Sequence, residues 1–189
     1  MVRLGYSVGP AIAAVGALSV ALIVPPLLSA AVPTRETEVA AGTSITLTAT
    51  GIGAVHGGPD PANAVTFQAP ERMRQLATGD ESIAVLKSEN GEQRLSVSVV
   101  DGITDFATAA PRMLLPLQAA GVTVRFDGQE VYAGDWHGLT CVLPDTVGGV
   151  CAVANSGDVA VTITVTGPTR EAGLRMIADV LNSSKAVQA

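Results

Sequence analysis

An uncharged stretch at the N-terminus constrains this chain more than any other feature. No charged residue lies between Arg3 and Arg35. A helix needs about 20 apolar residues to cross the hydrocarbon core of a membrane, and residues 6–28 supply them. Arg3 and the α-amino group precede the stretch, so the positive-inside rule places the N-terminus in the cytoplasm. The sequence therefore predicts a single-pass anchor in the cell membrane over residues 1–32, followed by an extracytoplasmic domain.

A cleavable signal peptide is the alternative explanation of the same stretch. Ser29-Ala30-Ala31 offers small residues for cleavage after Ala31, and Pro25-Pro26 can end the apolar helix before that point. The stretch is longer than the roughly 7–15 residues of a signal-peptide core, which favours a retained anchor. Cleavage would instead give a secreted soluble domain. Both explanations export the domain.

The charge balance of the chain is acidic. The formal net charge is −6, from 17 acidic and 11 basic residues. Electrostatic binding of nucleic acid requires a basic surface, so no nucleic-acid partner is predicted. Charged residues make up only 15% of the chain and apolar residues 48%, which excludes a wholly disordered protein. The acidic excess is typical of a solubilising surface.

The part of the chain that follows the anchor divides into three predicted segments. Residues 33–43 are predicted to be a juxtamembrane linker, residues 44–183 the folded domain, and residues 184–189 a frayed tail. Within the domain, short runs of alternating apolar and polar residues predict strands. These runs cover residues 44–50, 65–68, 82–88, 93–100, 122–126, 131–132, 139–143, 150–155 and 159–166.

Turn and helix signals set the order of these strands. Asn90-Gly91 and Asp127-Gly128 each lie between two strand-like runs and predict hairpin turns. A helix over residues 105–120 is predicted with Thr104 as its N-cap, and its prolines, Pro111 and Pro116, predict a kink or a later start. A second helix is predicted over residues 170–182, capped by Thr169. The order of strands, helix, strands and helix predicts an α+β fold with a mainly antiparallel sheet and two packed helices.

The two cysteines are predicted to form a disulfide. Cys141 and Cys151 are the only cysteines, each in an apolar strand-like run, and turn residues separate the two runs. Pairing of the runs would bring the two Cβ atoms to disulfide distance, and export favours oxidation. The cysteines lack the CxxC spacing and the histidine cluster of a zinc site. A reactive thiol remains the weaker alternative.

The sequence carries no common catalytic motif. G-x-S-x-G, S-x-x-K and H-E-x-x-H are all missing, and no catalytic, cofactor-binding or metal-binding residue is predicted. Asp135, Trp136 and His137 form the most distinctive polar and aromatic cluster, and they are a candidate ligand pocket. The alternative is that Trp136 packs at the start of a strand while its neighbours are solvated.

The order of elements resembles a known family. A short strand ending in Phe67-Gln68-Ala69-Pro70 is followed by a hairpin, a long helix, a meander and a terminal helix. This order, with the segments at residues 99–114 and 138–142 and the run that begins at Asn155, resembles the PsbP-like domains of exported and membrane-anchored actinobacterial cell-envelope proteins. The resemblance spans about residues 37–183. It implies a binding or accessory domain rather than an enzyme, and it transfers no functional residue.

Three functions are compatible with these features. The first is a non-catalytic, membrane-anchored module that binds an envelope protein or a lipid-like ligand and needs no cofactor. The second is an exported enzyme with an unrecognised site around Asp135 and His137, and the third is a purely structural subunit. The uncharged stretch and the missing motifs favour the first.

Overall fold

The computed structural model describes residues 36–51 and 63–187 of the chain. The anchor predicted over residues 1–32 lies outside these residues. Within the described ranges, no helix is both long and apolar enough to cross a membrane.

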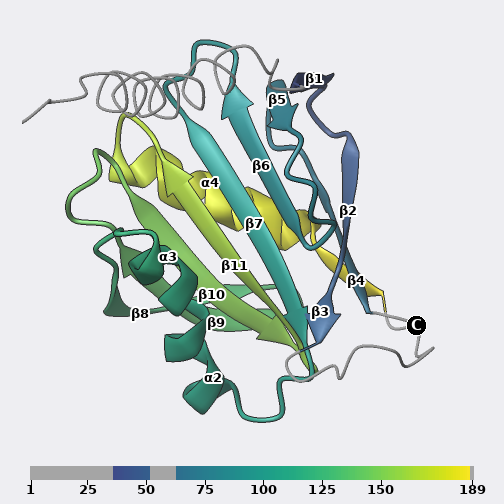
Figure 1. Ribbon diagram of the computed structural model, residues 1–189, viewed down its shortest axis with the longest axis vertical. Coiled ribbons are helices and arrows are strands. Elements are labelled where there is room, and N and C mark those ends of the chain that lie inside the picture. Colours follow the sequence, from purple (N-terminus) through teal and green to yellow (C-terminus); the bar gives the residue numbers. More distant parts are fainter. Residues whose placement is uncertain (1–35, 52–62, 188–189) are drawn as a thin grey trace, which may run out of the picture. The chain divides into compact units, whose positions relative to one another are not determined.

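A large, mainly antiparallel sheet forms the centre of the domain (Figure 1). Its strands follow the order β1, β5, β6, β7, β11, β10, β9, β8, and the short strand β3 runs parallel to the end of β7. The strands are β1 (Glu36–Val39), β3 (Thr50–Gly51), β5 (Met73–Leu76), β6 (Ile83–Ser88), β7 (Arg94–Asp101), β8 (Arg125–Ala133), β9 (Trp136–Val142), β10 (Val150–Ser156) and β11 (Val159–Thr166).

One face of this sheet is covered by a helix and a second sheet. The second sheet has three strands, in the order β12 (Lys185–Val187), β4 (Ala64–Gln68) and β2 (Ser44–Thr48). The helix is α4 (Arg170–Ser183), which lies behind β7 and β11 in Figure 1. Alternate residues of β7, namely Leu95, Val97 and Val99, point toward this face and are buried with the apolar side of α4.

Two short helices cover part of the opposite face. They are α2 (Phe106–Met113) and α3 (Leu115–Ala119), drawn in front of the sheet in Figure 1. The chain breaks at Leu114 because Pro116 has no N–H and its ring opposes the carbonyl of the preceding turn, so the predicted kink is confirmed. Ala110 and Leu114 pack against Cys141, Cys151 and Val153 of the sheet below. The α+β class, with its antiparallel sheet and packed helices, is therefore confirmed.

The two cysteines are joined as predicted. Cys141 on β9 and Cys151 on β10 are paired directly across the antiparallel ladder. Their Cα atoms are 4.8 Å apart, and a disulfide links the side chains beneath α2. The cross-link therefore ties together the two strands on which α2 packs.

Three local predictions about strands and their ends were wrong. Residues 36–39, predicted as linker, form β1 beside β5, and residues 185–187, predicted as frayed tail, form β12 beside β4. Both are short edge strands, and each is held in place by pairing with a strand that is distant in the sequence. The Asp127-Gly128 pair is not a hairpin turn, because β8 continues through it with a shift in register. Gly128 has a φ of +79° there, which produces a bulge within a single strand.

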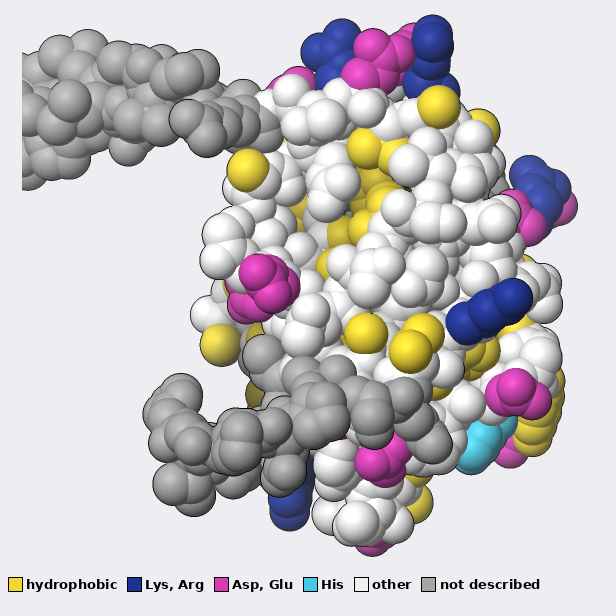
Figure 2. Space-filling view, turned by 90° about the vertical axis from the view of Figure 1, so that its right-hand side faces the viewer, with side chains coloured by type: hydrophobic (Ala, Val, Ile, Leu, Met, Phe, Trp, Pro, Cys, Tyr) yellow, Lys and Arg dark blue, Asp and Glu magenta, His cyan; other side chains and the backbone are white. Residues whose placement is uncertain are grey.

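Ion pairs hold the β1 edge of the large sheet. Glu36 pairs with Arg74 of β5 and Lys87 of β6, and Arg72 pairs with Glu38. Figure 2 shows acidic and basic side chains together at the top of the molecule, where β1 lies. The hydrogen bond from Lys87 is the main cause that holds the pKa of Glu36 below its usual value. These groups are exposed, so each pair contributes little to stability.

Candidate functional site

A pocket lies between α2 and the part of the large sheet that the helices leave open. Its volume is about 420 Å³. The end of β7, the loop that follows it, α2, the start of α3 and one residue of β11 provide its walls. The walls are mainly apolar, and their largest apolar side chains are Val100, Ile103, Met113 and Pro116.

The floor of the pocket carries two hydroxyl groups. Ser98 of β7 and Thr162 of β11 are opposite each other in the antiparallel ladder, so their side chains leave the sheet on the same face. Thr162 is only 7% exposed, and Ser98 is half-buried. Within the described ranges neither hydroxyl has a hydrogen-bond partner. The floor therefore offers two uncommitted donors inside an otherwise apolar space.

A side-chain cap fixes the start of α2. Asp105, rather than the predicted Thr104, is the N-cap: it accepts hydrogen bonds from the backbone N–H of Thr108 at 3.2 Å and from its hydroxyl at 2.6 Å. These bonds, the one from the hydroxyl first, hold the pKa of Asp105 below its usual value. The cap orients the helix so that Ala109 and Met113, four residues apart, line the pocket.

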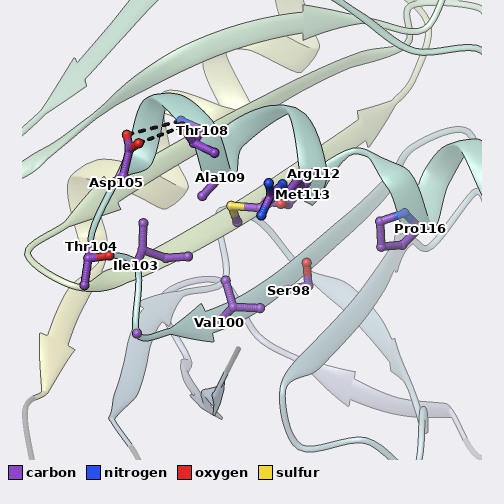
Figure 3. A pocket seen from close by; sticks show the side chains of 12 residues that line it. Ser98, Val100, Ile103, Thr104, Asp105, Thr108, Ala109, Arg112, Met113 and Pro116 are labelled. Carbon is purple, nitrogen blue, oxygen red and sulfur yellow. Dashed lines mark hydrogen bonds between the residues drawn. The ribbon is translucent and has the colours of Figure 1, made fainter. Parts of the chain in front are cut away.

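The two charged residues in the described lining of the pocket lie apart from each other, and Arg112 lies between Asp105 and Pro116 (Figure 3). Asp105 is beside Thr104 and Ile103, whereas Arg112 is near Met113 and on the side where Ser98 lies. Seven positions along the chain separate the two charges, which corresponds to about 10 Å along a helix. Arg112 takes part in none of the salt bridges found in the described part of the chain. The Arg112 side of the pocket therefore combines a cation that forms no salt bridge with two hydroxyls that have no hydrogen-bond partner in the described structure.

The predicted Asp135, Trp136 and His137 pocket is not formed. Successive residues of a strand point to opposite faces, and Trp136 is buried on the α4 side, where its indole N–H donates to the Ser184 carbonyl at 3.2 Å. The His137 ring contacts the ring of Phe106 on α2, with 5.9 Å between centroids. The alternative, Trp136 packing at the start of a strand, is confirmed.

The components of an active site around His137 are not brought together. Asp135 and His137 are both exposed, and the described residues give neither of them a hydrogen bond or an ion pair. A general base must be within hydrogen-bond reach of the group it deprotonates. No group of three or more possible metal ligands occurs in residues 36–51 and 63–187. The pocket under α2 is therefore the better candidate for a functional site.

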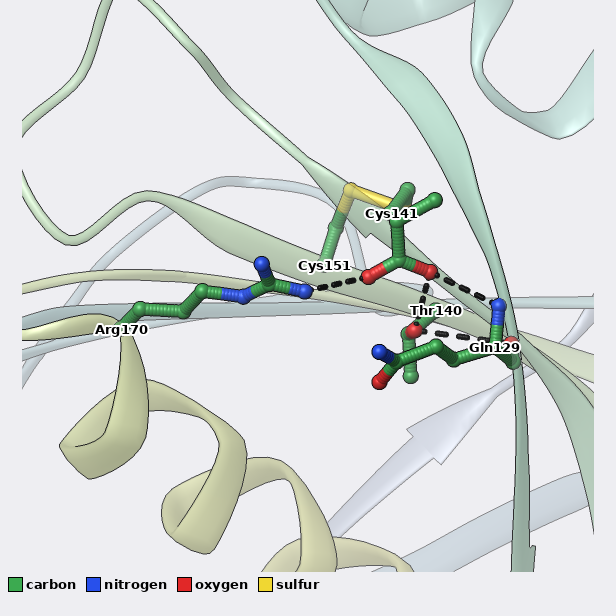
Figure 4. Close-up of polar contacts among 6 residues, drawn as sticks. Gln129, Thr140, Cys141, Cys151 and Arg170 are labelled. Carbon is green, nitrogen blue, oxygen red and sulfur yellow. Dashed lines mark hydrogen bonds and ion pairs between the residues drawn. A yellow bond between two sulfur atoms is a disulfide. The ribbon is translucent and has the colours of Figure 1, made fainter.

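A polar cluster near the start of α4 was missed by the sequence reasoning (Figure 4). Asp127 accepts a hydrogen bond from the Thr140 hydroxyl at 2.6 Å and one from the Gln129 N–H at 3.1 Å, and it pairs with Arg170. The Asp127 side chain is only 12% exposed. The cluster joins β8, β9 and the first residue of α4, and every group in it already has a partner. Its role is therefore structural.

A second hollow lies on the side of the molecule seen in Figure 2. It is open, has a volume of about 420 Å³, and lies between β2 and β5 with the loop after β5. Figure 2 shows apolar side chains at the bottom of a depression on this side. Most of its lining is polar, including Thr37, Thr46, Gln75 and Asp80. It has neither the apolar walls nor the unpaired cation of the pocket under α2.

The comparisons with known proteins give no relative. No family model matches the chain, and a search of curated proteins finds no match. The resemblance to PsbP-like domains therefore stays a prediction.

Proposed function

We propose that the chain is a non-catalytic binding module, anchored in a membrane by its N-terminus, that holds a lipid-like ligand in the pocket under α2. One observation carries the proposal: an apolar-walled pocket of about 420 Å³ lies between α2 and β7. Sites for small molecules in proteins have volumes of about 300–1,000 Å³ and mainly apolar walls with a few polar groups. The size and lining of this pocket agree with both features.

The chemistry of the lining supports binding rather than catalysis. Nucleophilic catalysis by a hydroxyl needs a base within hydrogen-bond reach. Ser98 and Thr162 have no such partner in the described structure, and the Asp105 carboxylate is engaged by Thr108. Among the described residues, the lining contains no histidine, cysteine or lysine. These groups can orient a ligand without activating it.

The proposed location follows from the N-terminal sequence and from the disulfide. The stretch without charges ahead of Arg35 suits a membrane anchor. Disulfides persist in extracytoplasmic compartments and are rare in the cytosol, and the Cys141–Cys151 bond agrees with an exported domain. A ligand drawn from the adjacent membrane would explain why a binding domain is tethered there.

A photoreactive lipid tests the proposal in the native setting. Membranes that contain the full chain are supplied with a lipid analogue carrying a diazirine in its acyl chain, irradiated, and the labelled peptides are identified by mass spectrometry. We expect labelling within residues 98–116, in addition to any labelling of the anchor. Labelling confined to residues 1–35 would contradict the proposal.

Two phenylalanine variants supply the matched control. Ala109→Phe places a large ring in the pocket, whereas Ala107→Phe places the same ring on the exposed side of the same helix. Labelling of residues 98–116 should fall several-fold in Ala109→Phe and stay unchanged in Ala107→Phe. Equal labelling in both variants would show that the lipid does not occupy the pocket.

A further inference from the structure

We infer that the ligand is a single-chain anionic amphiphile, whose oxyanion head is bound by Arg112, Ser98 and Thr162 and whose chain lies along α2 toward Ile103. This inference rests on the proposed function and goes beyond it, because it assigns the charge, the orientation and the number of chains of the ligand. It depends on where the charged groups and the hydroxyl groups lie in the pocket.

Arg112 supplies the charge that selects the head group. Among the described residues it is the only cation in the lining, and it forms no salt bridge there, although its charge attracts the Asp105 carboxylate. A guanidinium presents a planar fork of N–H donors that fits the oxygens of a carboxylate or a phosphate. An unpaired arginine at the edge of an apolar pocket therefore favours an anionic head over a neutral one.

The two floor hydroxyls provide the second, independent observation. Thr162 is more than nine-tenths buried, faces the pocket and has no hydrogen-bond partner in the described structure. Its hydroxyl is accessible from the pocket, so a ligand oxygen placed there can accept a hydrogen bond from it. Ser98 lies directly across the ladder from Thr162, and Figure 3 shows it on the Arg112 side of the pocket. The inference places the oxyanion of the ligand among these three groups.

The opposite end sets the orientation of the ligand. Asp105 is negative, and two hydrogen bonds from Thr108 hold it in place, so an anionic head is repelled there. Ala109 lies between the two charged positions, while Met113 lies next to Arg112 and Ile103 next to Asp105, so apolar contact extends from one charge to the other. An anion at Arg112 with its hydrocarbon chain directed toward Ile103 satisfies both ends.

The size of the pocket matches a ligand with one chain. A volume of about 420 Å³ corresponds to ~14 groups of the size of a water molecule, at ~30 Å³ each. One acyl chain and a small head fill that space, which is the basis for assigning a single-chain ligand. A fatty acid and a single-chain phosphate ester share the required chemistry.

Competition against the photoreactive lipid tests the inference. Membranes with the full chain receive one of five competitors that have the same linear alkyl chain and differ in the head: a carboxylate, a phosphate monoester, an alcohol, a methyl ester or a trimethylammonium group. We expect the carboxylate or the phosphate to displace the label from residues 98–116 at least about five-fold better than the neutral compounds. The better of the two anions identifies the source of the head group.

Charge-matched variants separate recognition by Arg112 from general attraction to the surface. Arg112→Gln and Arg125→Gln each remove one exposed arginine that forms no salt bridge, but only Arg112 lines the pocket. The preference for anions should disappear in Arg112→Gln and persist in Arg125→Gln. The double variant Ser98→Ala, Thr162→Val keeps the shape of the floor and should weaken binding of the anion without changing that of the alcohol.

The outcomes distinguish this inference from the proposed function. Equal displacement by charged and neutral competitors, or the same preference in Arg112→Gln as in the unmodified chain, would overturn the inference and leave a lipid-binding pocket. Preference for the trimethylammonium compound would also overturn it and would point to Asp105 as the head-group site. Failure of every competitor, with no label in residues 98–116, would overturn both.

Discussion

Asp105 determines where α2 begins, and its carboxylate makes that role dependent on pH. Its pKa in the folded protein is lowered by the hydrogen bonds from Thr108. The unfolded chain therefore binds a proton more readily than the folded one. The stabilisation that the ionised Asp105 carboxylate provides is fully present above the ordinary aspartate pKa of about 3.9. It is lost as the pH falls through the lowered pKa of the folded state.

The first prediction follows from this direction of the pH dependence. Asp105→Ala should lower the thermal midpoint of unfolding at neutral pH, because the first turn of α2 loses its cap. The difference from the unmodified protein should shrink as the pH is lowered below about 3.9. Thermal unfolding followed by circular dichroism across this pH range measures it. Asp179→Ala removes the same charge from the exposed side of α4 and serves as the control. A difference that is constant with pH would contradict the prediction.

The choice of cap shows what a sequence reveals at the scale of one residue. Thr104 and Asp105 are both good cap residues, and sequence alone favours neither strongly. The structure selects Asp105 because Thr108, three positions later, supplies two donors to one carboxylate. On the other side of the helix, Phe106, Ala110 and Leu114 face the sheet.

At the scale of elements, alternation of apolar and polar residues predicts the strands in which every second side chain is buried. It misses the strands whose side chains are mostly exposed. β7 and β11 have clear period-two patterns and were predicted closely. β1 and β12 are short, their side chains are mostly exposed, and their order depends on pairing with β5 and β4. Nothing in a local pattern reports such a distant partner.

The second prediction concerns the cross-link between two elements. Cys141→Ala with Cys151→Ala removes the disulfide that joins β9 to β10. For a loop of this length, the chain-entropy model gives a loss of about 3 kcal/mol in the free energy of unfolding. Urea denaturation of both proteins measures the loss.

A reductant provides the control for this measurement. Under dithiothreitol the unmodified protein should unfold at about the same urea concentration as the double variant, because both then lack the cross-link. An unchanged midpoint without reductant would mean that the disulfide adds nothing to stability. The variant also tests the pocket, since α2 packs directly on the two cysteines.

At the scale of the whole molecule, the pocket exists because the two faces of the large sheet are covered unequally. α4 and the small sheet cover one face, whereas α2 and α3 lie over β9 and β10 and leave part of β7 and β11 open. The fold class was predictable because it follows from local patterns and short connections. The pocket was not, because it requires Ser98 and Thr162 to be neighbours, and their distance in the sequence gives no sign of this.

The C-terminal residues link the layers of the molecule, which leads to the last prediction. Ser184 accepts a hydrogen bond from the buried indole of Trp136, and β12 continues the small sheet beside β4. Truncation after Ser183 removes both contacts and leaves the indole N–H without that acceptor. A buried donor without its partner costs about 1–3 kcal/mol, so the free energy of unfolding should fall by at least that amount.

Trp136 is the only tryptophan and reports directly on this contact. Its emission should shift to longer wavelength in the truncated chain as water reaches the indole, and urea denaturation followed at the same wavelength gives the loss of stability. Truncation after Val187 retains β12 and the Ser184 carbonyl, and it should leave both readings unchanged. If truncation after Ser183 changed neither, the last residues would be a tail without structural effect.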